Sequence, residues 1–167
     1  MPTTYTDCDE EVFGLVRKII KRTHPELAEA GVEVNCVFAM NGETAALKHQ
    51  GYQALAIVKI NDLKARQQGL KDATIFLDAN AWKDMPGPQQ AALIDHELTH
   101  LVPMRDKEGE IKKDDLDRPR LRIRLHDYHL GGFLEVAKRH RQASHEHAQM
   151  SSAVEKFVQL ELPFSIG

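Results

Sequence analysis

The chain has 167 residues, the usual length of one domain, and it can build a hydrophobic core without disulfides or a structural metal. Its 22 basic and 25 acidic residues give a net charge of -3, which excludes a protein that coats nucleic acid with a broad basic surface. A hydrophobic share of 42% excludes a disordered acidic chain, and two cysteines are too few for a disulfide framework.

The first half of the chain predicts one helix followed by three strands. Asp9 is placed to cap a helix that ends before Pro25, because the apolar residues between them recur at helical spacing. Alternating apolar residues predict a strand over 32–38. Two more apolar runs, 54–60 and 73–77, predict further strands with a polar connection between them.

The second half predicts mainly helices. The breaker Pro86-Gly87-Pro88 precedes an apolar helix expected over 89–102. The charged stretch 105–124 predicts a solvated loop or hairpin with a short strand at its end, and we expect most of it to move as a flap beside the functional site. Two later helices are expected over about 133–141 and 145–162. This order predicts a single α+β domain over residues 1–167, with a small mixed or antiparallel sheet packed on helices.

Nine histidines, more than twice the ordinary share, direct attention to metal or proton chemistry. In the predicted helix 89–102, His96 and His100 lie about 40° apart around the axis and can bind one zinc ion from the same side. Glu97 is rotated by about 100° from His96, so it can reach a water at the metal without being a ligand. This is the H-E-x-x-H arrangement of zinc metalloproteases. The alternative is a polar network within the core, or a metal site without activity.

Zinc needs a third protein ligand and an open position for water. We favour His126, because it follows the predicted short strand and so lies at the end of a defined element. Asp127 beside it could orient a ligand histidine through the second ring nitrogen. His129 is the second choice, and it or Tyr128 could steady an oxyanion. The other candidates downstream are Glu135, His140, His145 and His147. The three histidines among them are expected on the solvated surface. His24 and His49 lie by loop signals and are expected to have no role.

These residues resemble a known family. The strand 73–77, Trp82, the motif from Asp95 to Leu101, the segment 118–127 and Phe133 are similar to the putative phage metallopeptidase family, small zincin-like proteins of bacteriophages and prophages. The resemblance implies a zincin-like fold, a zinc-dependent peptidase and His126 as the third ligand. The chain departs from the family where Gly131-Gly132 precede Phe133, since acidic residues commonly stand there.

The leading hypothesis is a zinc endopeptidase or related amide hydrolase that acts on a peptide or protein, with Glu97 as general base. The strand 73–77 is expected to be the sheet edge that pairs with an extended substrate. One alternative is a non-catalytic, zinc-stabilised binding or virion-associated protein, against which the presence of Glu97 argues. Another alternative is a DNA-associated protease similar to the SprT-like proteases. The arginines of the segment 118–124 favour this alternative, and the net charge of -3 argues against it.

Location follows from what the sequence lacks. No run of about 18 apolar residues predicts a membrane span, and the polar N-terminus has no apolar signal-peptide core. We therefore expect a cytoplasmic protein without membrane or nucleic-acid partners, in the host cytoplasm if a phage encodes it.

Overall fold

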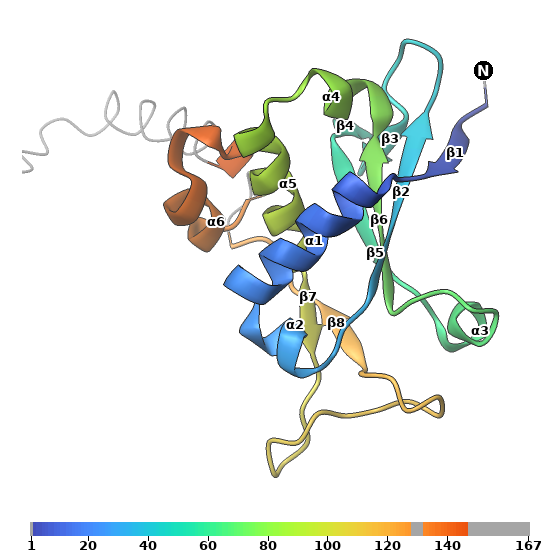
Figure 1. Cartoon of the computed structure of the whole chain (residues 1–167), viewed down its shortest axis with the longest axis vertical. Coiled ribbons are helices and arrows are strands. Elements are labelled where there is room, and N and C mark those ends of the chain that lie inside the picture. The colour runs from blue at the N-terminus through green and yellow to red at the C-terminus, as the bar shows by residue number, and fades with distance from the viewer. Residues whose placement is uncertain (1, 128–131, 147–167) are drawn as a thin grey trace, which may run out of the picture.

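The computed structural model describes residues 2–127 and 132–146 (Figure 1). At its centre is a four-stranded sheet in the order β1-β2-β6-β5. Strands β2 and β6 are parallel and the two outer pairs are antiparallel, so the predicted α+β class with a small mixed sheet is confirmed. The strands are β1 (Thr4–Asp7), β2 (Val34–Met40), β5 (Ala56–Ile60) and β6 (Ala73–Asp78).

The order of the strands corrects one expectation about the sheet edge. Strand β6, expected to be free for a peptide, lies between β2 and β5 and pairs with both. Its residues are nearly all buried, as a strand paired on both sides and covered by helices requires. The edge strands of this sheet are β1 and β5.

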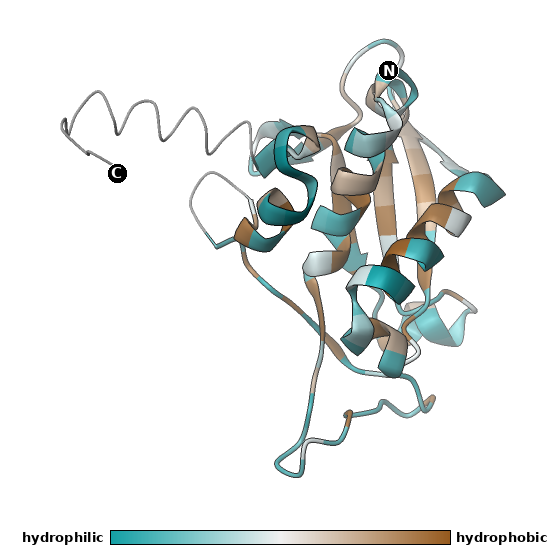
Figure 2. Cartoon of the chain, turned by 60° about the vertical axis from the view of Figure 1, so that its left-hand side comes forward, coloured by the Kyte–Doolittle hydropathy of each residue, from teal (hydrophilic) through white to brown (hydrophobic). Residues whose placement is uncertain are grey.

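Helix α1 (Glu10–Thr23) begins and ends as its sequence predicts. The Asp9 side chain accepts a hydrogen bond from the N–H of Val12 at 3.1 Å, and the short helix α2 (Pro25–Glu29) starts at the proline. The apolar residues of α1 pack with those of the sheet and of helix α5 (Gly87–Thr99) in one core cluster. Figure 2 shows the strands coloured mainly as hydrophobic, while the helices carry both colours.

Helix α5 ends earlier than expected. It begins in the Pro86-Gly87-Pro88 breaker as predicted, but it stops at Thr99 rather than near residue 102. The residues that follow form strand β7 (Leu101–Pro103), which pairs antiparallel with β8 (Leu121–Ile123), the short strand predicted at the end of the charged stretch. An apolar run this short fits a helix or a strand equally well, and the pairing with β8 makes residues 101–103 a strand.

Besides β1, α2 and β7, four short elements are absent from the sequence-based prediction or only partly anticipated by it. A tight hairpin joins β3 and β4, and its turn places Gln50 and Gly51 at φ of 51° and 84°, a region that glycine enters freely. Helix α3 lies within the expected polar connection, and the side chain of its N-cap, Asp62, accepts a hydrogen bond from the N–H of Ala65 at 2.8 Å. Helices of five or six residues carry too little apolar periodicity to be predicted. These elements are β3 (Leu47–His49), β4 (Tyr52–Ala54), α3 (Leu63–Gln67) and α4 (Ala79–Asp84).

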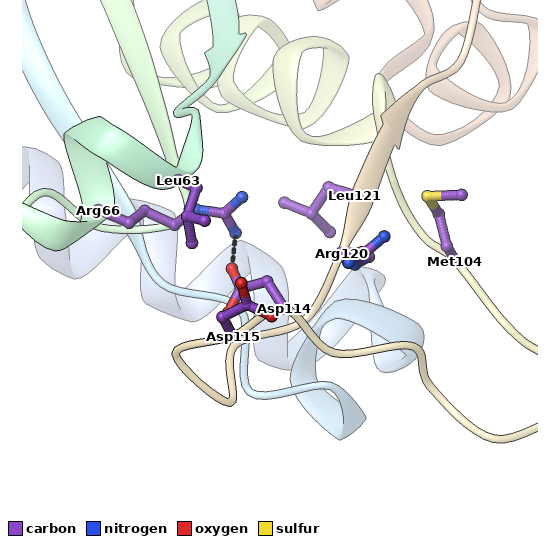
Figure 3. A pocket seen from close by; sticks show the side chains of 7 residues that line it. All are labelled: Leu63, Arg66, Met104, Asp114, Asp115, Arg120 and Leu121. Atoms are coloured by element: carbon purple, nitrogen blue, oxygen red, sulfur yellow. Dashed lines mark ion pairs between the residues drawn. The ribbon is translucent and has the colours of Figure 1, made fainter.

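The charged stretch forms an exposed hairpin-like loop that leaves the body at the Pro103–Leu121 end of the β7–β8 ladder. Three ion pairs connect it to the body: Arg66 to Asp114 at 2.8 Å, Arg118 to Asp72 at 2.7 Å, and the more exposed pair of Arg105 and Glu29 at 3.2 Å. The first spans one side of a cavity of about 270 Å³ under α3 (Figure 3). The loop therefore begins at the end of the β7–β8 ladder that is farther from His100. The prediction that it forms a flap beside the functional site is wrong about its position.

The C-terminal described part consists of helix α6 (Leu134–His140), as predicted, and the 3-10 turn η1 (Arg141–Ala143). Helix α6 packs on α5. Most of the helix expected over 145–162 lies outside the described residues, as do Tyr128, His129 and His147. Within the described ranges, no helix is long and apolar enough to cross a membrane.

Candidate metal centre

Three histidines converge at the C-terminal end of α5. His96 lies in the last turn of this helix, His100 is its C-cap one turn further on, and His126 follows β8. One ligand nitrogen from each of the three lies within 4.8 Å of the others, and the Nε2 atoms of His96 and His126 are 3.2 Å apart. The sequence-predicted set is therefore brought together, and this cluster could hold a metal ion.

The β7–β8 pairing explains why His126 reaches the motif helix. Beyond the last paired residues, the N–H of Arg124 donates to the carbonyl of His100 at 2.7 Å. In return, Nδ1 of His100 donates to the carbonyl of Arg124 at 2.7 Å. This double contact fixes the chain just before His126, so a residue distant in sequence is delivered beside the helix.

The free ring nitrogens of the cluster and their spacing fit a metal ion such as zinc. Nδ1 of His100 is bonded to the Arg124 carbonyl and Nδ1 of His96 to the carboxylate of Glu146, so that each ring keeps Nε2 for a metal. Zinc–nitrogen bonds of about 2.0–2.1 Å at tetrahedral angles put two ligand nitrogens about 3.3 Å apart, close to the separation of His96 and His126.

Burial keeps two of the three imidazoles neutral, the form that binds metal. It lowers the pKa of His100 to about 4, and the charges of the neighbouring His96 and His126 act in the same direction. Burial likewise lowers the pKa of His126. In His96 burial also favours the neutral ring, but the hydrogen bond to Glu146 and the charges of nearby carboxylates outweigh it and raise the pKa.

Glu97 directly follows His96 on α5, and only 4% of its surface is exposed. Burial raises its pKa to about 7, against the opposing effects of His96 and of a hydrogen bond from the backbone N–H of Val58 on β5. A carboxyl group with a pKa near neutrality can take up a proton and release it again. The bond to Val58 also places this carboxyl group against an edge strand of the sheet.

Phe133 forms an apolar floor under the cluster. Its ring is fully buried, and its centroid lies 4.7–5.2 Å from those of all three histidines. The sequence singled out Phe133 only through the family resemblance, since one aromatic residue before a helix carries no signal of its own.

Three other candidates lie outside the histidine cluster. Asp127 does not orient a ligand histidine: its carboxylate accepts from Arg124 at 3.0 Å and from the N–H of Leu134 at 3.1 Å, which holds the turn into α6. Glu135 pairs with Arg124 at 3.1 Å and is not part of the histidine cluster. His145 is exposed, as expected.

Two histidines expected to be unimportant instead contact a buried carboxylate on the motif helix. Nε2 of His140 lies 2.7 Å from Asp95, so its expected place on the solvated surface is wrong, because α6 packs this face against α5. Nε2 of His24 lies 2.7 Å from the same carboxylate. Burial opposes ionisation of Asp95, but the hydrogen bonds from both histidines and the charge of Arg139 hold its pKa below the ordinary range. His49, on β3, is exposed, and its charge contributes to the lowered pKa values of His100 and His126.

Sequence reasoning missed Glu146 as the partner of His96. The two residues are 50 positions apart, and Glu146 stands in a polar segment without any motif. Its burial, with 1% of the surface exposed, becomes visible only in the folded chain.

Comparison with known proteins identifies the family of the chain. The family model described as putative phage metallopeptidase matches residues 4–159, nearly the whole chain. Searches of curated proteins and of solved structures give no match. The match spans both the histidine motif and His126, and on this evidence the chain belongs to the putative phage metallopeptidase family.

Proposed function

We propose that the protein is a zinc-dependent peptidase with a zincin-like arrangement of sheet and motif helix. The observation that carries this proposal is the buried carboxyl group of Glu97, which directly follows His96, one of the three converging histidines. A metal site that only stabilises a fold needs no carboxyl group of this kind, whereas hydrolysis needs a group that accepts a proton. His96, His100 and His126 are the proposed ligands.

A bound zinc ion would polarise the scissile carbonyl group and lower the pKa of a water molecule to about 7. The role proposed for Glu97 is that of the general base, which would accept a proton from the attacking water. The same carboxyl group would then pass the proton to the departing amine nitrogen. Phe133 and the buried end of α5 exclude solvent from the rear of the site.

The substrate is proposed to lie along β5 rather than along β6. Strand β5 is an edge of the sheet, and Val58 on it is hydrogen-bonded to Glu97, so a peptide on this edge would pass the proposed base. Pairing an extended chain with an edge strand is a common mode of peptide recognition.

Two of the four arginines of the segment 118–124 favour a peptide substrate over a DNA-associated one. Arg118 is paired with Asp72, and Arg124 with Asp127 and Glu135. These guanidinium groups are therefore already neutralised within the chain and are poorly placed to bind phosphates.

The Glu97→Gln variant tests the proposal. Glutamine keeps the shape but cannot accept the proton, so we expect the variant to retain its zinc while cleavage of a labelled unfolded protein such as casein falls by about 100-fold or more. Zinc content is measured by atomic emission on wild-type and variant protein in parallel. If the wild type binds zinc and the variant cleaves as fast as the wild type, Glu97 is not the base. If neither cleaves any of a broad set of peptides, the non-catalytic alternative is preferred.

A further inference from the structure

Asp95 is the most deeply buried charged group next to the candidate metal centre, and it does not contact the three histidines of that centre. It is fully buried on α5, immediately before His96. We propose that Asp95 is a positioning residue: it clamps α6 onto α5, and α6 thereby holds Phe133 and Glu146 against the metal-binding histidines. The inference rests on the proposed metal site and adds a residue that acts on it from a distance.

Both oxygens of the Asp95 carboxylate are occupied by side chains from two other parts of the chain. Arg139 on α6 donates from one nitrogen to both oxygens at 2.8 Å. His140, also on α6, lies 2.7 Å from one oxygen, and His24, at the junction of α1 and α2, lies 2.7 Å from the other. Charge-assisted bonds in a buried site are strong, and a buried carboxylate needs them.

Helix α6 carries a metal-site contact at each end. Phe133 immediately precedes its first residue and touches all three histidine rings. Beyond its last residue, the turn η1 leads directly to Glu146, whose carboxylate bonds Nδ1 of His96. Asp95 binds the helix between these two contacts, so a displacement of α6 moves both.

A second chain of contacts links the clamp to His126. Arg139 also reaches Glu135 at 3.5 Å, Glu135 pairs with Arg124 at 3.1 Å, and Arg124 pairs with Asp127 beside His126 at 3.0 Å. These groups are partly exposed, and exposed pairs contribute little energy. The buried carboxylate of Asp95 is therefore the group in this series of contacts that contributes most to holding α6 in place.

The test is the Asp95→Asn variant, which keeps the side-chain shape but turns one acceptor into a donor that faces Arg139 or a histidine. In metal-free protein we expect the strongly downfield imidazole N–H resonance of His96, the signature of its bond to Glu146, to weaken or disappear in the NMR spectrum. Zinc affinity, measured by competition with a chromogenic chelator, should fall by about 10–100-fold, the usual effect of losing an outer partner of a metal ligand.

Asp72→Asn is the matched control. Asp72 has 1% of its surface exposed and is paired with Arg118 at 2.7 Å, but this pair ties the charged loop and lies outside the metal centre. We expect it to lower the melting temperature while leaving the His96 resonance and the zinc affinity unchanged. Should Asp95→Asn fail to fold, Arg139→Met removes a single partly exposed arm of the clamp and should weaken both signals in the same direction, by less.

A double variant shows whether Asp95 acts through Glu146. If it does, Glu146→Gln lowers zinc affinity in the wild type but has little further effect in Asp95→Asn. Full additivity, or a His96 resonance and zinc affinity unchanged in Asp95→Asn, overturns the proposal. A wild-type protein that binds no zinc refutes the metal site instead, and the metal-free His96 resonance still decides the role of Asp95.

Discussion

Replacing His126 with alanine should remove most of the stabilisation that zinc gives to the protein while leaving the metal-free fold nearly unchanged. His126 is only partly buried and follows β8, and its ring contacts are to His96, His100 and Phe133. No other described residue completes the set, since the only group of three potential ligands within 4.8 Å in residues 2–127 and 132–146 contains His126.

The size of the effect follows from binding linkage. Zinc at 100 times the wild-type Kd stabilises the folded protein by about 2.7 kcal/mol. In a domain of this size each kcal/mol raises the melting temperature by about 2–4 °C, so zinc should raise it by roughly 5–11 °C. Losing a direct ligand should weaken binding at least as much as losing an outer partner, so we take about 100-fold. The same zinc concentration then contributes only about 0.4 kcal/mol, or roughly 1–2 °C.

The assay is thermal unfolding followed by circular dichroism, with and without zinc. The control is His49→Ala, which removes an exposed histidine near the cluster and should keep the full zinc-dependent shift. If His126→Ala keeps this shift as well, His126 is not a ligand and the geometric argument fails. Loss of the shift in His129→Ala, with His126→Ala unchanged, would assign the third position to His129.

Two further predictions concern stability. Asp114→Ala should cost about 1–3 kcal/mol at pH 7 in urea unfolding, because it removes the acceptor for two backbone N–H groups and the partner of Arg66. Burial opposes ionisation of Asp114, but these hydrogen bonds and the charge of Arg66 outweigh it and lower the pKa of the carboxyl group. The stabilisation by Asp114 is therefore complete above the ordinary pKa of about 4 and is lost as the pH falls through the lowered pKa of the folded protein. A cost of the variant that is the same at pH 2 as at pH 7 would contradict this. Phe133→Ala should cost about 3–5 kcal/mol and also weaken zinc binding, because it leaves a cavity under all three histidines. If the free energy of unfolding and the zinc affinity of this variant equal those of the wild type, the Phe133 ring does not support the three histidines.

The sequence was sufficient where the physical cause is local. The spacing of His96 and His100 places both rings on one side of any helix, whatever surrounds it. Asp9 caps α1 through an N–H only three residues away, and the alternating residues of β2 show which of its faces is buried. These features depend on neighbours in the chain, so the helix, the strands and two metal ligands could be predicted from residue order.

Tertiary structure decided everything that depends on distant partners. Strand β6 looks the same in sequence whether it lies at the edge or in the middle of the sheet, and only its pairing with both β2 and β5 settles the matter. The contact of Glu146 with His96 and the gathering of His24 and Arg139 on Asp95 join segments that are 44 to 71 residues apart. Such contacts form because α6 docks on α5 and buries their charges together. A single side chain carries no local pattern that reveals which distant charge it will meet.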